Sequence, residues 1–328
     1  MRSTILFLSL ALPGLAAEAA STAQKLPAEF DHDRIFLVVK APDGSTLRIC
    51  TDSGGGGTRV SRSTAERLRL APAGEIDDAG RKMSLVEFPR FLAKAGVPAP
   101  NKRRGGFGAR AWVVDDTTME TGGDMFLGAN WYSDHVWQID YPRRELSIVR
   151  DFKPDAQDHE IPVGFMNDAR GRRALDYPRI GIRVDGQPID MLLDTGALFT
   201  TSERSAPAFG VAPGDRVAGS FIAKALFDQW HARHPDWTII EQGDSIHGHA
   251  FPLIEVPAVE VAGYTVGPVW FAERDDKVWS REGMMGPLMD EEIHGAFGGS
   301  GLHYFRVVVD YPRGKAWFRV APVRTASN

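Results

Sequence analysis

The chain is divided into short apolar runs separated by polar turns, a pattern typical of strands. Residues 34–39 form one such run, and Asp43 with Gly44 predicts a hairpin turn behind it. Residues 46–51 then predict a returning strand that ends at Asp52. The first half of the chain therefore offers a hairpin that delivers an acidic side chain at the end of a strand.

The same arrangement recurs in the second half. Residues 179–184 predict a strand, Asp185 and Gly186 predict a turn, and residues 188–193 predict the return to Asp194. In both hairpins the turn aspartate lies nine residues before the aspartate at the strand end. This shared spacing indicates an internal repeat rather than two unrelated hairpins.

Three further landmarks recur in the same order in the two halves. Residues 85–89 are echoed by 253–257, residues 125–128 by 283–286, and residues 139–143 by 309–313. Their shared order predicts two copies of one β-rich unit. The second copy is longer, because residues 221–231 add a stretch with helical spacing and the glycines of 298–301 predict a mobile loop.

These patterns predict an all-β chain, mainly strands with short helices, organised as two lobes. We expect an N-terminal lobe over residues 30–150 that carries Asp52 and a C-terminal lobe over 177–324 that carries Asp194. Residues 151–176 are rich in charged and polar side chains and are the natural connection between the lobes. A chain of 328 residues can bury two cores of this size.

The first residues have the features of an export signal. Arg2 precedes an apolar run over 5–12, and small residues follow up to Ala19. We therefore expect residues 1–19 to be a signal peptide and the mature protein to be exported, either periplasmic or secreted. No later segment approaches ~20 uninterrupted apolar residues, so no membrane association is expected after signal removal.

The composition limits which partners and cofactors we expect for this protein. The net charge of −5 and the lack of a long basic block give no electrostatic reason to expect nucleic acid as a partner. Cys50 is the only cysteine, which excludes an intramolecular disulfide and predicts a buried structural thiol. His231 and His234 are spaced to share a helix face, but without a third ligand nearby they predict no metal site. We expect neither a metal nor another cofactor.

The two aspartates at the strand ends, Asp52 and Asp194, are the candidate catalytic residues. A pseudo-twofold relation between the two units would bring Asp52 and Asp194 close together, and two adjacent carboxylates cannot both ionise readily. One then holds a proton while the other stays anionic, and the pair titrates jointly. This suits hydrolysis of an amide, because the anion can take a proton from an attacking water while the protonated carboxyl group hydrogen-bonds the carbonyl oxygen.

The residues that follow each aspartate fit such a site. Gly54 and Gly196 predict tight backbone turns. Ser53 and Thr195 carry hydroxyl groups that can hold the two loops together.

A triplet of Asp, Ser or Thr, and Gly therefore follows a strand twice, and each triplet is followed later by two apolar residues and a glycine. The two sets are Asp52-Ser53-Gly54 with Phe126-Leu127-Gly128, and Asp194-Thr195-Gly196 with Met284-Met285-Gly286. In these motifs the chain resembles the aspartic proteases. Its closing Asp-Tyr-Pro strands look like those of bacterial retropepsin-like members, and the resemblance covers about residues 35–320.

The resemblance implies a bilobal aspartic-protease fold of two pseudo-twofold-related, β-barrel-like lobes with a cleft between them. It implies that Asp52 and Asp194 are catalytic and that the substrate is a polypeptide. The residues that it implies as supports of the active-site loops are Ser53, Gly54, Thr195, Gly196, Ala197, Gly128 and Gly286. Because both halves lie in one chain, we expect a monomer. Flap hairpins are expected near residues 73–84 and 242–251.

The first site departs from the family pattern. Cys50 and Thr51 precede Asp52 in place of two aliphatic residues, and the four glycines of 54–57 are costly to order. Gly55 and Ala197 stand where pepsin-type members commonly carry a serine that hydrogen-bonds the carboxylate. With fewer donors the pKa of the anion should be higher, which predicts activity toward mildly acidic or neutral pH.

Two functions follow from these observations. The first is an exported aspartic endopeptidase that uses Asp52 and Asp194. The alternative is a non-catalytic peptide-binding protein on the same scaffold, in which the glycine-rich first site does not assemble a working pair. The separation of the two carboxyl groups distinguishes them.

Overall fold

The computed structural model describes residues 22–78, 81–101, 108–119, 122–246 and 248–320. Short strands dominate these residues, and the ten-residue α5 (Lys224–Arg233) is the longest helix among them. The expectation of a mainly β chain with short helices is confirmed. The predicted signal peptide lies outside the described residues.

The N-terminal half forms an eight-stranded sheet in the order β2-β3-β4-β9-β5-β8-β7-β6. Its strands are β2 (Ala28–Asp31), β3 (Arg34–Lys40), β4 (Thr46–Thr51), β5 (Thr58–Ser61), β6 (Pro72–Asp78), β7 (Arg81–Glu87), β8 (Arg110–Val114) and β9 (Met125–Leu127). The predicted first hairpin is β3 and β4, and it ends one residue before Asp52.

The C-terminal half forms a nine-stranded sheet in the order β18-β19-β22-β17-β23-β14-β13-β20-β21. Its strands are β13 (Arg179–Val184), β14 (Gln187–Leu193), β17 (Ser220–Ala223), β18 (Ile239–Ile246), β19 (His249–Val256), β20 (Val259–Val261), β21 (Tyr264–Val266), β22 (Val269–Arg274) and β23 (Gly295–Phe297). The second predicted hairpin is β13 and β14, which leads into Asp194.

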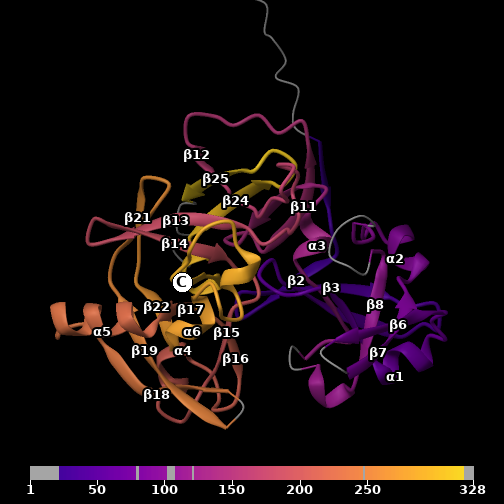
Figure 1. Ribbon diagram of the computed structural model, residues 1–328, viewed down its shortest axis with the longest axis horizontal. Helices are drawn as coiled ribbons and strands as arrows, with labels where there is room; N and C mark the ends of the chain where they lie inside the picture. The colour runs from indigo at the N-terminus through magenta and orange to yellow at the C-terminus, as the bar shows by residue number, and fades with distance from the viewer. Residues whose placement is uncertain (1–21, 79–80, 102–107, 120–121, 247, 321–328) are drawn as a thin grey trace, which may run out of the picture.

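The two sheets share an order of seven strands. The run β3-β4-β9-β5-β8-β7-β6 of the first sheet corresponds to β13-β14-β23-β17-β22-β19-β18 of the second. In each run, the strand that leads to the aspartate pairs in parallel with a short later strand, β4 with β9 and β14 with β23. The two aspartates therefore stand at equivalent positions of two similarly ordered sheets (Figure 1).

A six-stranded sheet joins the halves, in the order β1-β11-β10-β24-β25-β12. Its strands are β1 (Thr22–Lys25), β10 (Val136–Asp140), β11 (Glu145–Arg150), β12 (His159–Pro162), β24 (Phe305–Asp310) and β25 (Lys315–Val320). The central pair is β10 with β24, one strand from each half. β12, from the segment that we expected only to connect the lobes, is an edge strand of this sheet. The labelled strands of this sheet, β11, β12, β24 and β25, lie in the upper part of Figure 1, above the two larger sheets.

The second copy of the motif of two apolar residues and a glycine is not at residues 283–286, where the sequence predicts it. The strand that pairs with β14 is β23, so the counterpart of Phe126-Leu127-Gly128 is Ala296-Phe297-Gly298. Met284-Met285-Gly286 lie before β23, in the segment 275–294 that contains α6 (Asp276–Trp279) and the 3-10 helix η2 (Gly286–Leu288). Spacing alone could not reveal this, because this segment itself carries an apolar pair followed by glycine.

Of two other expectations about the second half, one is wrong and the other is confirmed over residues 224–231 only. The glycines of 298–301 do not form a mobile loop, since Gly298 precedes the buried helix α7 (Gly299–Leu302). The helical stretch predicted over 221–231 is divided between strand β17 and helix α5. The remaining elements are α1 (Arg62–Arg67), α2 (Arg90–Lys94), η1 (Asp116–Thr118), α3 (Ala129–Tyr132), β15 (Leu198–Thr200), α4 (Ala206–Phe209) and β16 (Arg216–Ala218).

The predicted flap ranges fall in hairpins. β6 pairs with β7 and β18 pairs with β19, both antiparallel.

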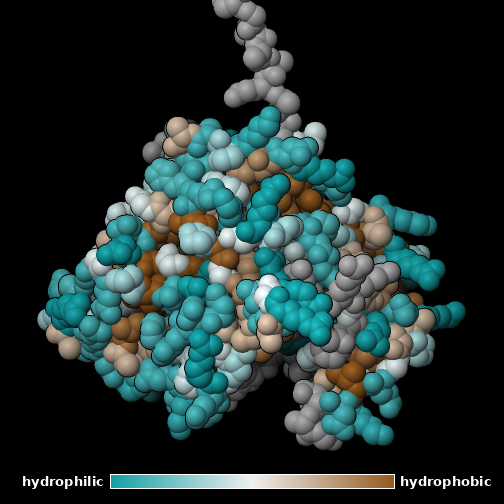
Figure 2. Space-filling view, turned by 45° about the horizontal axis from the view of Figure 1, so that its top comes forward, coloured by the Kyte–Doolittle hydropathy of each residue, from teal (hydrophilic) through white to brown (hydrophobic). Residues whose placement is uncertain are grey.

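The face of the molecule shown in Figure 2 is largely hydrophilic, and apolar residues gather in its recesses. Met284 is the large hydrophobic side chain that stands exposed among the described residues. No helix in the described part of the chain has the length and apolar character needed to span a membrane.

A buried ion pair fixes the strand that follows the second aspartate loop. The Asp244 Oδ1 atom accepts a hydrogen bond of 2.8 Å from the backbone N–H of Thr200 on β15. Its Oδ2 atom accepts one of 2.5 Å from Arg274, whose guanidinium lies over the Phe221 ring. Asp244 has no exposed surface, so both partners depend on it for their pairing.

The variant Asp244→Ala is expected to lower the free energy of unfolding by about 3–5 kcal/mol, because it leaves a buried guanidinium without its anion. Urea denaturation at neutral pH measures this. The control is Asp228→Ala, which removes a well-exposed partner of Lys224 and should change stability by less than about 0.5 kcal/mol. Equal effects of the two substitutions would contradict the importance of the Asp244 pair.

Candidate active site

Asp52 and Asp194 meet between the two large sheets. Their carboxyl groups are in hydrogen-bond contact with each other. Each backbone is fixed in the same way, because Asp52 N donates to Leu127 O at 2.9 Å and Asp194 N donates to Phe297 O at 3.0 Å. Each carboxylate is further held by its own loop, since Gly54 N donates to Asp52 Oδ1 and Gly196 N donates to Asp194 Oδ1.

Ser53 and Thr195 connect the two loops through reciprocal hydrogen bonds. The Ser53 N–H donates to Thr195 Oγ1 at 3.0 Å, and the Thr195 N–H donates to Ser53 Oγ at 3.0 Å. The Ser53 hydroxyl in turn donates to Leu193 O at 2.7 Å. Both side chains are buried, so these bonds are shielded from water and fix the spacing of the aspartates. The structure thus brings the predicted hydroxyl pair together.

Gly54 and Gly196 are required by close approach rather than by turn conformation. Neither has a positive φ, so the conformation of the turn does not itself require glycine. A Cβ atom on Gly54 would lie 2.4 Å from Asp194 Cγ, and one on Gly196 would lie 2.0 Å from Asp52 Cγ. Each loop therefore lies against the carboxyl group of the other half.

The glycine run after Asp52 is ordered by its neighbours. A Cβ atom on Gly55 would lie 2.3 Å from Phe126 Cζ and 2.5 Å from Asp52 Oδ2. Gly57 has a φ of +62° and its carbonyl accepts a hydrogen bond from Gly128 N at 3.0 Å. Any side chain on Gly128 would meet the carbonyls of Gly55 and Gly57 at 2.5 Å. The first loop is therefore assembled, and Gly128 supports it as predicted from the motif.

The supports of the second loop are Ala197 and Gly298. Buried Ala197 accepts a hydrogen bond of 2.9 Å from Gly219 N, and a Cβ atom on Gly298 would lie 2.7 Å from the Ala197 Cβ. The structure does not bring Gly286 to this loop. A Cβ atom there would meet Ser280 O at 2.0 Å, so Gly286 serves the packing of its own segment.

Burial raises the pKa of both aspartates, to different extents. Burial, the negative charge of Asp52 and its hydrogen bond all raise the pKa of Asp194 well above the usual range. Burial also raises the pKa of Asp52, but the hydrogen bond with Asp194, the Gly54 and Gly55 N–H groups and the charge of Arg59 oppose that rise. The two carboxyl groups therefore titrate as a pair, which shares one proton at intermediate pH.

Three nearby side chains were not found from the sequence. The Tyr132 hydroxyl lies 3.3 Å from Thr195 Oγ1, beneath the loop connection. The Tyr177 hydroxyl would be 3.2 Å from a Cβ atom on Gly56, and Arg59 donates to Gly56 O at 3.3 Å. None of the three lies within either repeated motif. The pairing order of strands that places Arg59 beside the loop was the missing information.

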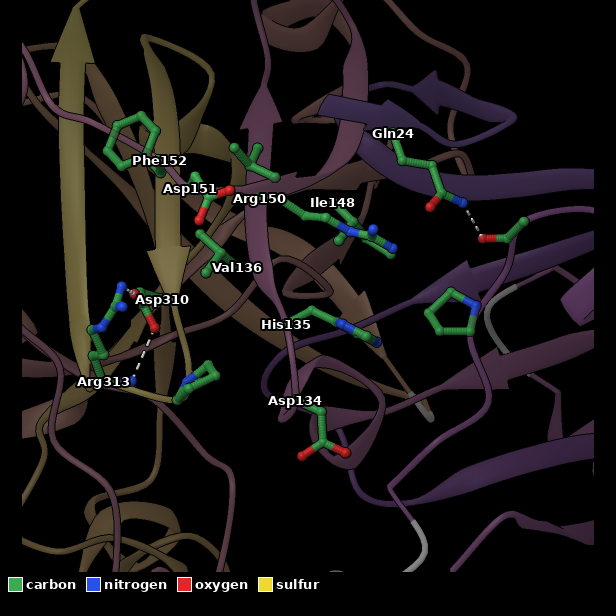
Figure 3. A pocket seen from close by; sticks show the side chains of 14 residues that line it. Gln24, Asp134, His135, Val136, Ile148, Arg150, Asp151, Phe152, Asp310 and Arg313 are labelled. Atoms are coloured by element: carbon green, nitrogen blue, oxygen red, sulfur yellow. Dashed lines mark hydrogen bonds and ion pairs between the residues drawn. The ribbon is translucent and has the colours of Figure 1, made fainter. Parts of the chain in front are cut away.

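A second hollow among the described residues offers no comparable chemistry. A cavity of about 530 Å³ lies beside the six-stranded sheet, lined among others by Asp134, His135 and Asp310 (Figure 3). Asp310 is already bonded to the N–H and the guanidinium of Arg313, and neither Asp52 nor Asp194 lines this cavity. Within the described ranges, no three His, Cys, Asp or Glu side chains are grouped to hold a metal ion.

Comparisons with known proteins give a distant likeness. No family model matches the sequence, and a search of the curated proteins finds no match. Among the solved structures, the chain is similar to an aspartic proteinase from Irpex lacteus, with 11% sequence identity and a TM-score of 0.47. The match covers 93% of this chain and 99% of that one. At this level of similarity, the function of the chain has to be argued from its own site.

Proposed function

We propose that the protein is an aspartic endopeptidase that hydrolyses peptide bonds with a water activated between Asp52 and Asp194. The observation that carries this proposal is the hydrogen-bond contact between the two carboxyl groups, each held by its own loop N–H. A pair with one shared proton offers a base and an acid at the same point, as hydrolysis of an unactivated amide needs.

The difference between the two carboxyl groups assigns their roles. Asp52 stays anionic and takes a proton from the water that attacks the carbonyl carbon. Asp194 carries the proton and donates a hydrogen bond to the carbonyl oxygen as negative charge develops there. Transfer of a proton to the amine nitrogen then releases both fragments and leaves the pair ready for the next water.

The non-catalytic alternative needs a first site that fails to assemble. The close packing of Gly55, Gly57 and Gly128 around Asp52 argues against that. The cross-bonds of Ser53 and Thr195 also favour the enzyme, because they hold the carboxyl pair in a buried setting where an unused pair would only destabilise the fold.

The cellular setting of the proposal comes from the sequence. The apolar N-terminal run supports removal of residues 1–19 and export to the periplasm or the medium. Both aspartates belong to one chain, so a monomer suffices for activity. The substrate is a polypeptide that enters between the two hairpins β6–β7 and β18–β19.

Replacing either aspartate by asparagine is expected to abolish cleavage. Asp52→Asn removes the base and Asp194→Asn removes the acid, so each should lower kcat/KM by at least about 100-fold on a denatured protein substrate. The control is Asp228→Asn, which changes an exposed helix carboxylate and should leave the rate unchanged. Full activity in either active-site variant would exclude a shared pair, and an inactive but folded parent chain would favour the binding protein.

The pH profile of cleavage is expected to be bell-shaped with its optimum above the ordinary range of carboxyl groups. Activity needs ionised Asp52 and protonated Asp194, and the pKa values of both are raised. The optimum should therefore lie above the ordinary carboxyl range rather than near pH 3. Initial rates from pH 3 to 8 measure this, and a profile confined to strongly acidic solution would contradict the assignment.

Asp194→Asn is also expected to stabilise the fold at neutral pH. The pKa of Asp194 is raised on folding, so its contribution to stability is complete below the ordinary carboxyl pKa and is lost as pH rises through the raised value. Asparagine cannot ionise, so the variant should be more stable than the parent at pH 7 and similar to it at pH 3. Denaturant unfolding at both pH values tests this and shows that the inactive variant is folded.

A further inference from the structure

We propose that Arg59 is a positioning residue whose guanidinium keeps the negative charge of the carboxyl pair on Asp52. The proposal deepens the protease function proposed above and rests on it, but its central measurement does not require cleavage. The argument starts from the position of Arg59 in the first sheet.

Arg59 belongs to a row of side chains that crosses the sheet on the side of the active site. Strand register places Arg59 opposite Phe126 on β9 and opposite Trp112 on β8. Phe126 is in turn opposite Cys50, two residues before Asp52. Because alternate residues of a strand share a face, the row and Asp52 lie on the same side of the sheet.

The guanidinium is held close to the Asp52 loop. It lies over the Phe126 ring, 4.5 Å from its centroid, and Nη2 donates to Gly56 O at 3.3 Å. A Cβ atom on Gly55 would touch both Phe126 Cζ and Asp52 Oδ2, so the ring that carries Arg59 also borders the carboxylate. The Phe126 ring therefore lies next to both the cation and the Asp52 loop.

Arg59 lacks the partner that a partly buried cation normally has. No carboxylate of the described residues forms an ion pair with it, and its buried Nε atom has no hydrogen-bond acceptor there. Arg274 in the other half has such a partner, because it lies over the Phe221 ring and forms an ion pair with Asp244. The charge of Arg59 is therefore balanced by the carboxyl pair itself.

The second half has no cation at the equivalent position. The counterpart of Arg59 is Phe221, which stands opposite Ala296 on β23 and Ala272 on β22. The strand order is the same, so the sheet does not need an arginine at this place. The cation therefore makes the two similar halves electrostatically different, and it favours the anion on the side of Asp52.

The thiol and phenol groups around Asp52 are neutral in the working range, and the cations Arg34 and Arg48 act on Cys50, with Arg48 paired to Glu29 and Asp31. The thiol and phenol groups in electrostatic contact with Asp52 are those of Cys50, Tyr132, Tyr177 and Tyr311. Burial raises the pKa of Cys50 to about 12 and raises the pKa of all three tyrosines. None of them can substitute for the charge of Arg59, which opposes the rise in the pKa of Asp52.

The test compares Arg59→Gln with Arg59→Lys in the full chain. The first readout is infrared titration of carboxyl groups in protein labelled with ¹³C-aspartate, where the band lost in Asp52→Asn identifies Asp52. We expect Arg59→Gln to move the Asp52 midpoint upward by about half to one pH unit, and Arg59→Lys to stay near the parent value. The second readout is the acidic limb of kcat/KM, which should move by the same amount.

Arg62→Gln is the matched control, because it removes a well-exposed arginine three residues away that pairs with Asp115. Arg59→Phe, which copies the residue at the equivalent position of the other half, is a second variant should Arg59→Gln fold poorly. An unchanged Asp52 midpoint in both neutral variants, or an equal shift in Arg62→Gln, overturns the proposal. If the parent chain cleaves nothing but the midpoint moves as expected, the role of Arg59 stands and the protease function fails.

Discussion

Two acidic side chains at strand ends, Asp194 buried and Asp52 half-buried, have to share one proton, and much of the surrounding structure serves that constraint. The two carboxyl groups cannot both be charged in this setting, so one of them holds the proton. Their approach is possible only because Gly54 and Gly196 carry no side chain, and it is fixed by the reciprocal bonds of Ser53 and Thr195. The two large sheets supply the strands, and the six-stranded sheet, which takes strands from both halves, joins them. The carboxyl pair lowers the stability of the fold at neutral pH, and the extensive buried core around it offsets this loss.

The sequence was sufficient for those features that local pattern determines. Hairpins with a turn nine residues before the aspartate revealed both strand ends, and the hydroxyl residues after each aspartate are the ones that connect the loops. These predictions succeeded because the spacing of a hairpin is set by its own residues. The mainly β character followed from the same short apolar runs.

The errors arose where the answer depends on which strands become neighbours. Met284-Met285-Gly286 has the composition of the second landmark, yet the strand beside β14 is β23, and Gly298 follows it. The glycines of 298–301 suggest mobility when read alone, but they are buried against the site because a larger residue would collide with Gly219, Ala218 and Phe297. Gly54 and Gly196 were predicted correctly in place but for the wrong reason, since the group that excludes a side chain belongs to the other half of the chain.

The similarity of the two halves also shows what the fold alone cannot provide. Two equivalent aspartates in two equally ordered sheets would share a proton evenly, and neither would have a fixed role. Function requires the symmetry to be broken by residues outside the motif. The two loops do this in part, since glycines follow Gly54 where Ala197 and bulkier residues follow Gly196. Arg59 in the first half and Phe221 in the second occupy equivalent positions and make the two sides electrostatically different. The strand order is the same with either residue. In a repeated fold, the places where equivalent residues differ in charge are therefore the ones that assign separate roles to identical catalytic groups.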